Sequence, residues 1–504
     1  MATRPQAPPR VAPGTPPGLL ERHRLAQAAL FLVFALAVRF PAFGEWNYAV
    51  DDQFFALVGH RMLAGDLLYV DIWDRKPPLL YLTYAAIAWV DRSVIAYQLV
   101  ATLFAALGSY ATARTARLVA SFPAAIMAGL AYCALLTRFG GANGEAAVFY
   151  NPLMIAAVWS IASSLGDLAR GQLPRRVLLG MVCAGLAIAY KQSALFEAGL
   201  LGIAPLVLLA RGGMAPRAIA GRALVLAALG ALPMVVIGLF YASIGHFPEA
   251  WQAMVQSNFA RAYDSSADSR LARALALLGL LVLPLALAAA GYLHGRSRID
   301  RRGTLDFLGL WALIAIAALA VFPSLYLHYA LPLVAPLAVL SAPFFAQPRV
   351  GPLGFAALVL INLATADTFD LATRSRAGPA AAALVEHLRQ ATPHGRLLVW
   401  GMPSYLYAEI GTRPPSVIAF PAHFYEGAEH GASGRDEVAE LRRVLREGPE
   451  TVVVQEPIPA RPVNAANAAQ VTDYLRGCAA VKRMTVYDHD GAVSLAVFNR
   501  CAGR

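Results

Sequence analysis

Charged side chains are scarce in this sequence. Only 14% of its 504 residues are Asp, Glu, Lys or Arg, whereas 58% are hydrophobic. Soluble domains carry about a quarter charged residues, so this balance argues against a soluble globular protein. The composition is typical of a chain that crosses a lipid bilayer several times.

The charge that is present is mostly positive, with a formal net charge of +11. Such an excess can indicate nucleic-acid binding, but here the arginines lie in short loops between long apolar runs. Cytoplasmic loops of membrane proteins retain positive charge in this way. We therefore exclude nucleic acid as a partner and expect the lipid bilayer to be one. The basic loops contain Arg114 and Arg117; Arg170, Arg175 and Arg176; Arg211, Arg217 and Arg222; and Arg296, Arg298, Arg301 and Arg302.

Cysteine is also rare, and four cysteines are too few for a disulfide scaffold. Cys133 and Cys183 lie inside apolar runs and are expected to be small buried hydrophobic residues. Cys478 and Cys501 lie in the polar C-terminal part. They could form a disulfide if that part faces an oxidising compartment, and two free thiols are the open alternative.

Several motifs are missing altogether. The sequence has no GxGxxG or Walker loop, no zinc-ligand spacing and no internal repeat. It therefore offers no nucleotide site and no His/Cys set for a metal. No cofactor is called for, although a divalent metal held by carboxylates stays open.

Long hydrophobic runs, by contrast, are abundant. About 11 runs of roughly 17 to 22 residues are long enough to cross a bilayer. They lie at 25–41, 94–112, 120–137, 149–166, 176–192, 194–210, 222–242, 271–293, 305–322, 330–346 and 352–370. With the N-terminus inside, all of the basic loops fall on the cytoplasmic side. The Pro- and Arg-rich residues 1–24 are expected to form a disordered cytoplasmic tail.

A shorter apolar segment at 77–90 tests this topology. Its length of about 14 residues is too short for an ordinary span, and counting it as one would move every later basic loop outside. We predict a juxtamembrane helix there, within a first outer loop at 42–93. The first run also resembles a signal peptide, with "ALA" at 35–37. Cleavage there would leave the remaining topology unchanged.

The last span would end outside, so residues 371–504 are predicted to form an extracytoplasmic α/β domain after a transmembrane domain at 25–370. Strands are expected at 396–401 and 451–455. A helix is expected at 436–448, with Asp436 as its N-cap residue and Gly448 at its C-terminal end. The last segment, 478–501, resembles a hairpin that turns at "DHDG".

Ionisable residues gather at one level, near the outer ends of the predicted spans. Topology alone would bring these distant residues into one layer, and ionisable groups at a membrane indicate function. Each also has an ordinary structural interpretation, which the sequence leaves open. The layer contains Arg39, Asp51, Asp52, Arg75, Lys76, Arg138, Glu145, Lys191, Glu197 and His328.

Two pairs of residues in the first outer loop are the main candidates. Asp51 and Asp52 could cap a surface helix, or act as a general base and a second acid. Arg75 and Lys76 precede Pro77 and could reach to the lipid headgroups as structural residues. As functional residues they would hold a phosphate beside the membrane, because lysine offers a point charge and arginine a two-pronged donor.

Later candidates have the same two interpretations. Glu145 either complements the helix that follows it or acts as a catalytic acid. Lys191 either reaches to the headgroups or contacts a phosphate, and we expect Glu197 to pair with it. His328 and Tyr329 suit an aromatic belt or a substrate contact. Arg138, in the loop before Glu145, is a further candidate for a substrate contact.

Five segments carry a resemblance to a known group. The stretch "VDDQFFALVGHRMLAGDLLYVDIWDRKPPLLY" resembles the first outer loop of polyprenyl-phosphate-dependent glycosyltransferases of the GT-C superfamily, of the protein mannosyltransferase and aminoarabinose transferase type. "GANGEAAVFYNPLMIAA" resembles their second acidic loop. "GLAIAYKQSALF", "YLHYALPLVAPLAVL" and "LLVWGMPSYLYAEIGTRPPS" resemble later segments.

The resemblance implies an inverting transferase that moves a sugar from a polyprenyl-phosphate carrier to a glycan, lipid or protein acceptor. It further implies a position in the bacterial inner membrane and chemistry on the outer side. Asp51 matches the catalytic acid, Lys76 the phosphate-contacting lysine and Glu145 the acid of the second loop. Lys191 lies in the matching Lys-Gln step. Asp52 departs from the usual Glu, which leaves its role open. An uncleaved first helix also follows, because it must hold Asp51.

Other classes of protein remain open from the sequence. A transporter or flippase of lipid-linked sugars would show broken helices, charges at mid-membrane and related halves, which we do not find. A non-catalytic glycan-assembly protein would leave Asp51, Lys76 and Glu145 without a task. A polymerase or ligase of lipid-linked glycans shares the donor chemistry and differs in its acceptor.

Overall fold

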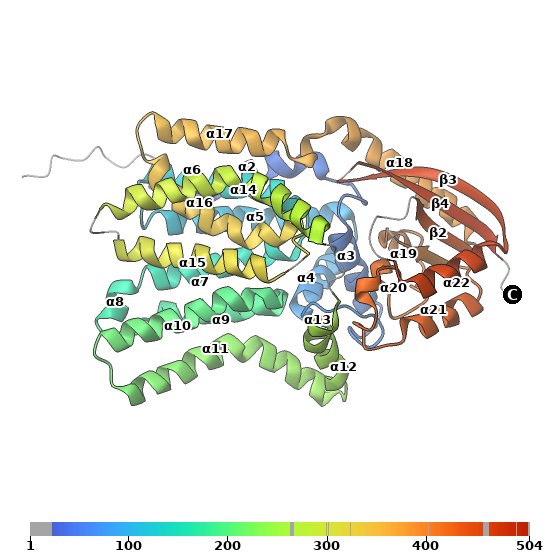
Figure 1. The fold of residues 1–504 in the computed structure, drawn as a ribbon, viewed down its shortest axis with the longest axis horizontal. Helices are drawn as coiled ribbons and strands as arrows, with labels where there is room; N and C mark the ends of the chain where they lie inside the picture. The colour runs from blue at the N-terminus through green and yellow to red at the C-terminus, as the bar shows by residue number, and fades with distance from the viewer. Residues whose placement is uncertain are drawn as a thin grey trace, which may run out of the picture.

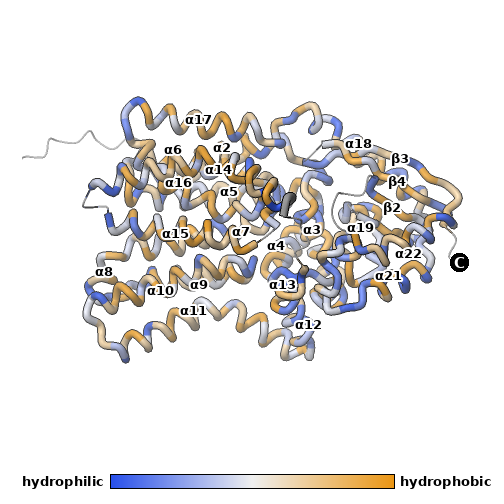
Figure 2. The backbone as a smooth tube through the Cα atoms, viewed as in Figure 1, coloured by the Kyte–Doolittle hydropathy of each residue, from blue (hydrophilic) through white to orange (hydrophobic). Residues whose placement is uncertain are grey.

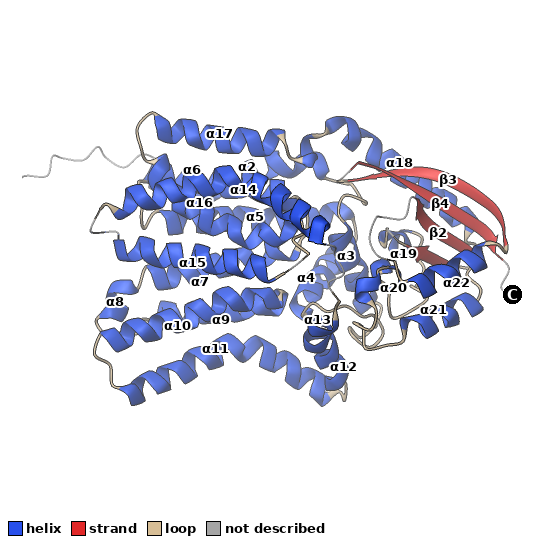
Figure 3. Ribbon diagram, in the orientation of Figure 1, coloured by secondary structure: helices blue, strands red, loops and turns tan. Residues whose placement is uncertain are grey.

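The computed structural model describes residues 23–262, 267–298, 300, 302–322, 324–401, 403–456, 463–489 and 491–501. The predicted tail at 1–24 lies outside these residues, apart from its last two. The described chain forms a helical bundle joined at one end to a smaller domain that contains the sheet (Figures 1 and 3). All four strands of that sheet lie in the C-terminal part.

The bundle is built from helices that run roughly side by side (Figure 1). They are α2 (Arg24–Arg39), α5 (Val94–Ala116), α6 (Phe122–Leu136), α7 (Ala146–Ala162), α9 (Arg175–Tyr190), α10 (Leu195–Arg211), α11 (Pro216–Ser243), α14 (Ala267–Arg296), α15 (Arg302–Val321), α16 (Leu331–Phe345) and α17 (Val350–Ala364). Short α8 (Leu165–Ala169) connects α7 to α9. Eleven predicted spans thus correspond to eleven helices of the bundle.

Among the described residues, eight helical segments are long and apolar enough to cross a membrane. Three predicted spans, at 149–166, 176–192 and 352–370, form the shorter helices α7, α9 and α17. These have 17, 16 and 15 residues. At 1.5 Å per residue they reach about 23–26 Å, somewhat less than a hydrocarbon core of about 30 Å. The predicted spans run past the helix ends into polar residues, such as Ser163 after α7 and Lys191 after α9.

The surface of the bundle is apolar, as lipid requires. Hydrophobic residues dominate its helices, whereas hydrophilic residues concentrate in the C-terminal domain (Figure 2). Large hydrophobic side chains such as Leu224, Val236 and Leu360 are exposed on it. Because a helix pairs its own backbone groups, such a surface can face hydrocarbon without unpaired polar groups.

The first outer loop lies between the bundle and the C-terminal domain (Figure 1). It contains the turn η1 (Phe40–Ala42) and helices α3 (Val50–Leu63) and α4 (Pro78–Val90). The predicted short helix at 77–90 is therefore confirmed as a helix. Gly59 lets α3 pack closely on α4, since a Cβ there would lie 2.8 Å from the backbone nitrogen of Ala85.

Further short segments surround this loop. The turn η2 (Thr137–Gly141) follows α6, η3 (Gln192–Ala194) precedes α10, and η6 (Leu327–Ala330) precedes α16. Between α11 and α14 lie α12 (Phe247–Trp251), η4 (Gln252–Gln256) and α13 (Ser257–Ala260). Of these segments, α12 and α13 are seen at the end of the bundle that faces the C-terminal domain (Figure 1).

The C-terminal domain has a four-stranded sheet in the order β1-β2-β4-β3. Parallel β1 and β2 pair Leu397 with Thr451, and the antiparallel hairpin of β3 and β4 pairs Cys478 with Cys501. Those two cysteines form a disulfide. The elements are η7 (Asp367–Phe369), α18 (Leu371–Ala391), β1 (Leu397–Trp400), α19 (Tyr405–Glu409), α20 (Pro421–Tyr425), η8 (Gly427–Glu429), α21 (Glu437–Arg446), β2 (Thr451–Glu456), α22 (Ala465–Leu475), β3 (Cys478–Asp488) and β4 (Gly491–Cys501).

Local signals in the sequence explain these elements. Asp436 caps α21 by accepting hydrogen bonds from the backbone N–H groups of Val438 and Ala439. Gly448, with φ of +72°, follows its end. The predicted strands at 396–401 and 451–455, the helix at 436–448 and the terminal hairpin are all confirmed.

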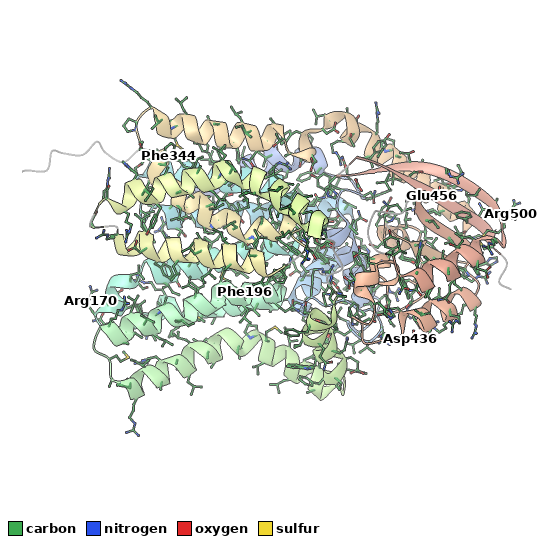
Figure 4. All side chains as sticks on the ribbon, in the orientation of Figure 1. Arg170, Phe196, Phe344, Asp436, Glu456 and Arg500 are labelled. Atoms are coloured by element: carbon green, nitrogen blue, oxygen red, sulfur yellow. A yellow bond between two sulfur atoms is a disulfide. The ribbon has the colours of Figure 1, made fainter. Side chains whose placement is uncertain are left out.

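Polar contacts join the C-terminal domain to the first outer loop. Glu45 forms a buried ion pair with Arg374 of α18, and the Trp73 backbone N–H donates to the carbonyl of Val417 at 2.8 Å. The loops at the other end of the bundle, including Arg170, lie far from Asp436 and Glu456 of the domain (Figure 4). Fixed contacts therefore hold the domain against the end of the bundle that carries the candidate residues.

Candidate functional site

Asp51 and Asp52 lie in the first turn of α3, where their side chains have different surroundings. Ala49, not an aspartate, is the N-cap residue, so neither side chain serves as the predicted cap. Asp51 Oδ2 lies 3.9 Å from Lys76 Nζ, and the Asp51 side chain is 31% exposed. Asp52 is 1% exposed and accepts a hydrogen bond from the Gly144 backbone N–H at 3.3 Å. Burial raises the pKa of Asp52 to about 8.

Lys76 is held between two acids at the start of α4. Its Nζ lies 3.5 Å from Asp74 Oδ2 and 4.6 Å from the centre of the Phe55 ring. Burial alone would lower the pKa of Lys76, but Asp51 and Asp74 outweigh burial and raise it. Asp74 also accepts a hydrogen bond from the Tyr81 hydroxyl. Lys76 is therefore a charged ammonium group fixed at the outer rim of the bundle.

Glu145 enters the same region from the loop between α6 and α7. It is the N-cap residue of α7 and accepts from the Ala146 N–H at 3.0 Å. Its Oε1 lies 3.7 Å from Lys191 Nζ and 3.7 Å from His328 Nε2. Burial would raise the pKa of Glu145, but Lys191 and the other cations lower it on balance. The predicted structural role at the helix start is present, and it leaves Oε1 directed at other groups.

The loop that carries Glu145 is fixed by buried residues of the bundle and of the first outer loop. Arg39 donates to the carbonyls of Gly141 and Asn143 and to the Thr102 hydroxyl. The Tyr84 hydroxyl donates to the Gly144 carbonyl at 2.8 Å, on the residue whose N–H donates to Asp52. Arg39 and Asp52 thus belong to the framework that positions Glu145.

Lys191 and Tyr329 complete this side of the region. Lys191 is the C-cap residue of α9, and its Nζ lies 5.3 Å from the centre of the Tyr329 ring. The expected pairing of Glu197 with Lys191 is wrong. Glu197 instead accepts a hydrogen bond from Trp311 Nε1 of α15 at 2.6 Å. The sequence could not reveal this partner, which lies 114 residues away.

We call the residues that converge here the outer-rim cluster, defined as Asp51, Lys76, Glu145, Lys191 and His328. Three of them, Asp51, Glu145 and His328, have potential metal-ligand atoms within 4.8 Å of one another. Glu145 Oε1 is buried and has no hydrogen-bond partner among the described residues. Carboxylate oxygens and an imidazole nitrogen suit a divalent cation, so these three side chains fit one.

Arg75 and Arg138 lie beside the cluster with different contacts. Both Nη atoms of Arg75 bind Glu429 of the C-terminal domain, at 3.4 Å for the longer contact. Arg261, after α13, binds the same carboxylate at 2.9 Å. Arg138 Nε is buried without a hydrogen-bond partner in the described part of the chain. The predicted contacts of Arg75 and Arg138 with substrate stay predictions.

Sequence reasoning missed four residues of this region. Asp74 and Tyr81 were visible within "YVDIWDRKPPLLYL" but were not singled out. Glu429 and Arg261 gave no local signal, because they reach Arg75 only through the tertiary fold. The acid that pairs with Arg75 is 354 residues from it in the sequence.

The cluster combines an accessible acid with fixed cations. Asp51 is 31% exposed, whereas the side chains of Asp74 and Glu145 are only 5% and 7% exposed. An incoming molecule could therefore reach Asp51 most readily. Lys76 offers positive charge beside Asp51 and Lys191 beside Glu145, which suits an anion bound next to a base.

Comparison with solved structures identifies the fold. The chain is similar to ArnT from Cupriavidus metallidurans bound to undecaprenyl phosphate, with a TM-score of 0.61 and 15% sequence identity over 94% of this chain and 98% of that chain. ArnT from the same organism in the apo state gives 0.58 and 15% over the same shares. No protein-family model and no curated protein matches the sequence. The GT-C-like fold expected from the sequence is thereby confirmed.

Proposed function

We propose that the protein is an integral-membrane glycosyltransferase that moves a sugar from a polyprenyl-phosphate carrier to an acceptor. The observation that carries this proposal is the convergence of Asp51, Lys76, Glu145 and Lys191 at one end of a bundle with the ArnT fold. The ArnT structure was solved with undecaprenyl phosphate bound, which supports the same class of carrier. A lipid-linked donor also agrees with a polar site located at the rim of an apolar bundle.

The transfer step uses Asp51 as the general base. An acceptor hydroxyl or amine attacks the anomeric carbon of the sugar while Asp51 accepts its proton. The bond from that carbon to the phosphate oxygen breaks, and the carrier phosphate leaves with the electron pair. Lys76 and Lys191 stabilise the charge that develops on this leaving group. Attack opposite the departing phosphate inverts the anomeric carbon.

Asp52 and Glu145 have supporting roles in this scheme. Asp52 holds the Gly144 loop, so its contribution is to position Glu145. Glu145 keeps Lys191 and His328 in place through contacts at 3.7 Å. Asp51, Glu145 and His328 could also hold a divalent cation, which would supply further positive charge toward the carrier phosphate.

The chemistry is proposed to take place on the extracytoplasmic side of a bacterial inner membrane. The disulfide between Cys478 and Cys501 supports this side, because disulfides persist in oxidising compartments. The basic loop at Arg170 lies at the opposite end of the bundle (Figure 4). On this basis residues 371–504 form a periplasmic domain that would shape the acceptor cleft, and residues 25–370 form the catalytic domain.

Binding of the carrier tests this function. Purified protein is mixed with undecaprenyl phosphate and analysed by native mass spectrometry. We expect one bound lipid per chain, and Lys76→Ala should weaken binding about tenfold or more because a charge-assisted phosphate contact is lost. Glu447→Gln, which alters an exposed ion pair on α21, is the matched control and should bind as the wild type does. Absence of binding to the wild-type protein would reject the proposal.

A further inference from the structure

Glu429, the last residue of η8, has a side-chain carboxylate that is bound by two arginines from different segments. Its carboxylate is 5% exposed and pairs with Arg75 of the first outer loop and with Arg261 after α13. The Ala262 backbone N–H donates to the Ala428 carbonyl at 3.1 Å beside this pair. Segments from the first loop, the α13 region and the C-terminal domain therefore meet at a single acid.

Two chains of contacts lead from Glu429 to the outer-rim cluster. The first runs through Arg75 to its neighbour Lys76, which lies 3.9 Å from Asp51. The second runs through Arg261, which hydrogen-bonds Tyr329. The ring of Tyr329 in turn lies under Lys191 Nζ, at 5.3 Å. Both lysines of the cluster are thus linked to the same carboxylate.

The segment around Lys76 is otherwise fixed through its backbone. Gln192 Nε2 donates to the Arg75 carbonyl at 2.7 Å, and the Tyr69 hydroxyl donates to the Lys76 carbonyl at 2.7 Å. Tyr69 has a φ of +73°, a conformation that costs free energy in a residue other than glycine and persists where the surroundings impose it. The Arg75–Glu429 contact adds the side-chain restraint that comes from the C-terminal domain.

We propose that Glu429 is a positioning residue through which the C-terminal domain sets the geometry of Lys76 and Lys191. This inference rests on the proposed function, because both lysines are assigned there to the carrier phosphate. Without Glu429, Arg75 and Arg261 would be two partly buried guanidinium groups that lack their counter-charge. Such groups move to regain partners or water, and the segments that carry them would shift with them.

The expected consequence is a loss of rate that exceeds the loss of binding. A displacement of about 1 Å in a positioned group can lower a rate by up to about 100-fold. The carrier, in contrast, would still meet both lysines and the apolar bundle. Glu429→Gln should therefore lower turnover about tenfold or more, while the Kd for undecaprenyl phosphate changes less than about threefold.

The experiment measures both quantities on folded protein. Membrane vesicles from a host strain that lacks the protein supply donor and acceptor, and release of free polyprenyl phosphate is followed per mole of monodisperse protein. Glu429→Gln, Glu429→Asp and the control Glu447→Gln are compared with the wild type, and undecaprenyl phosphate binding is measured by native mass spectrometry. Glu429→Asp, which keeps the charge, should have an intermediate rate, and Glu447→Gln the wild-type rate.

The outcomes separate this inference from the proposed function. If the wild type releases polyprenyl phosphate and Glu429→Gln releases it at the same rate, the positioning role is wrong and the function stands. If the rate of Glu429→Gln falls only by the same factor as its binding of undecaprenyl phosphate weakens, the positioning role of Glu429 is also wrong. If Glu429→Gln does not fold, Glu429→Asp decides: a wild-type rate contradicts the inference. A wild type that neither binds undecaprenyl phosphate nor releases carrier contradicts both proposals.

Discussion

Neighbouring residues of this protein can have opposite environments, as Asp51 and Asp52 do. One helix position separates them, and this rotates Asp51 toward Lys76 and the exposed rim and Asp52 into the protein. Asp51 is therefore available as a base, whereas Asp52 is a buried hydrogen-bond acceptor for the Gly144 N–H. The separation is consistent with the proposed base role of Asp51 and with a structural role for Asp52.

The raised pKa of Asp52 predicts a dependence of stability on pH. In the unfolded chain its pKa is about 3.9, and in the folded protein it is about 8 because of burial. Between these values the folded state binds more protons, so the free energy of unfolding falls as pH rises from about 4 to about 8. Asp52→Asn stays neutral, and we expect it to be more stable than the wild type at pH 9 by about 1 kcal/mol or more.

Thermal unfolding in detergent at pH 5.5 and pH 9 measures this effect. Glu45, whose pKa burial raises to about 7, contributes in the same direction, so the variant should retain a smaller pH dependence. A variant whose stability falls between the two pH values as much as that of the wild type would show that Asp52 is ionised in the folded protein.

Individual residues could be predicted from the sequence where topology alone brings them together. Asp51 and Lys76 lie in the predicted first outer loop, whereas Glu145, Lys191 and His328 lie near the outer ends of predicted spans. The structure brings all five into one cluster. Pairings set by tertiary contacts could not be predicted. Glu197 binds Trp311 of α15 rather than the nearby Lys191, and Arg75 binds Glu429, because partner choice depends on which helices pack together.

At the scale of elements, the pair of helices α3 and α4 supports both Asp51 and Lys76. Asp51 lies in the first turn of α3, and Lys76 lies two residues before α4 begins at Pro78. The distance between the proposed base Asp51 and the proposed phosphate-binding Lys76 therefore depends on how closely these helices pack. Gly59 is a point of close contact between them, where any larger residue would meet the backbone of α4.

We expect Gly59→Ala to destabilise the protein and to lower its activity. The new Cβ would lie 2.8 Å from the Ala85 nitrogen and the Tyr84 carbonyl carbon, and such overpacking costs about 1–3 kcal/mol. Gly199→Ala in α10 is the matched control, because nothing lies within 4 Å of its added Cβ. Thermal unfolding and carrier release of both variants test this, and equal stability of Gly59→Ala and Gly199→Ala would contradict the close packing.

At the scale of the whole molecule, the account requires the C-terminal domain to lie outside the cytoplasm. The domain contacts the first outer loop through Glu45, Trp73 and Arg75. Both therefore lie on the same side of the membrane. Composition was sufficient to predict a helical membrane bundle followed by a C-terminal α/β domain, since apolar length identifies spans. The side of the membrane on which that domain lies stays a prediction from the loop arginines. The lengths of the short helices α7, α9 and α17 were less well predicted, because the ends of an apolar run do not mark where a helix begins and ends.

Thiol labelling tests the side of the domain. Spheroplasts are treated with an impermeant reductant and then an impermeant maleimide. We expect labelling of Cys478 and Cys501 only after reduction, because the disulfide must first open. Cys478→Ser/Cys501→Ser, which retains Cys133 and Cys183 of the bundle, is the control and should not be labelled. Labelling of the wild type only after lysis would place the domain in the cytosol and contradict the topology.

In the proposed mechanism, Asp51 and Lys76 act together on a sugar carried by a polyprenyl phosphate. The most direct measurement is mass spectrometry of the lipid that co-purifies with the wild type and with Asp51→Asn. Loss of the base should stop transfer without preventing donor binding, so the variant should retain polyprenyl phosphate with its sugar attached, whereas the wild type should carry mainly the bare carrier. Finding no polyprenyl phosphate on either protein, or the same ratio of sugar-linked to bare carrier on both, would contradict this mechanism.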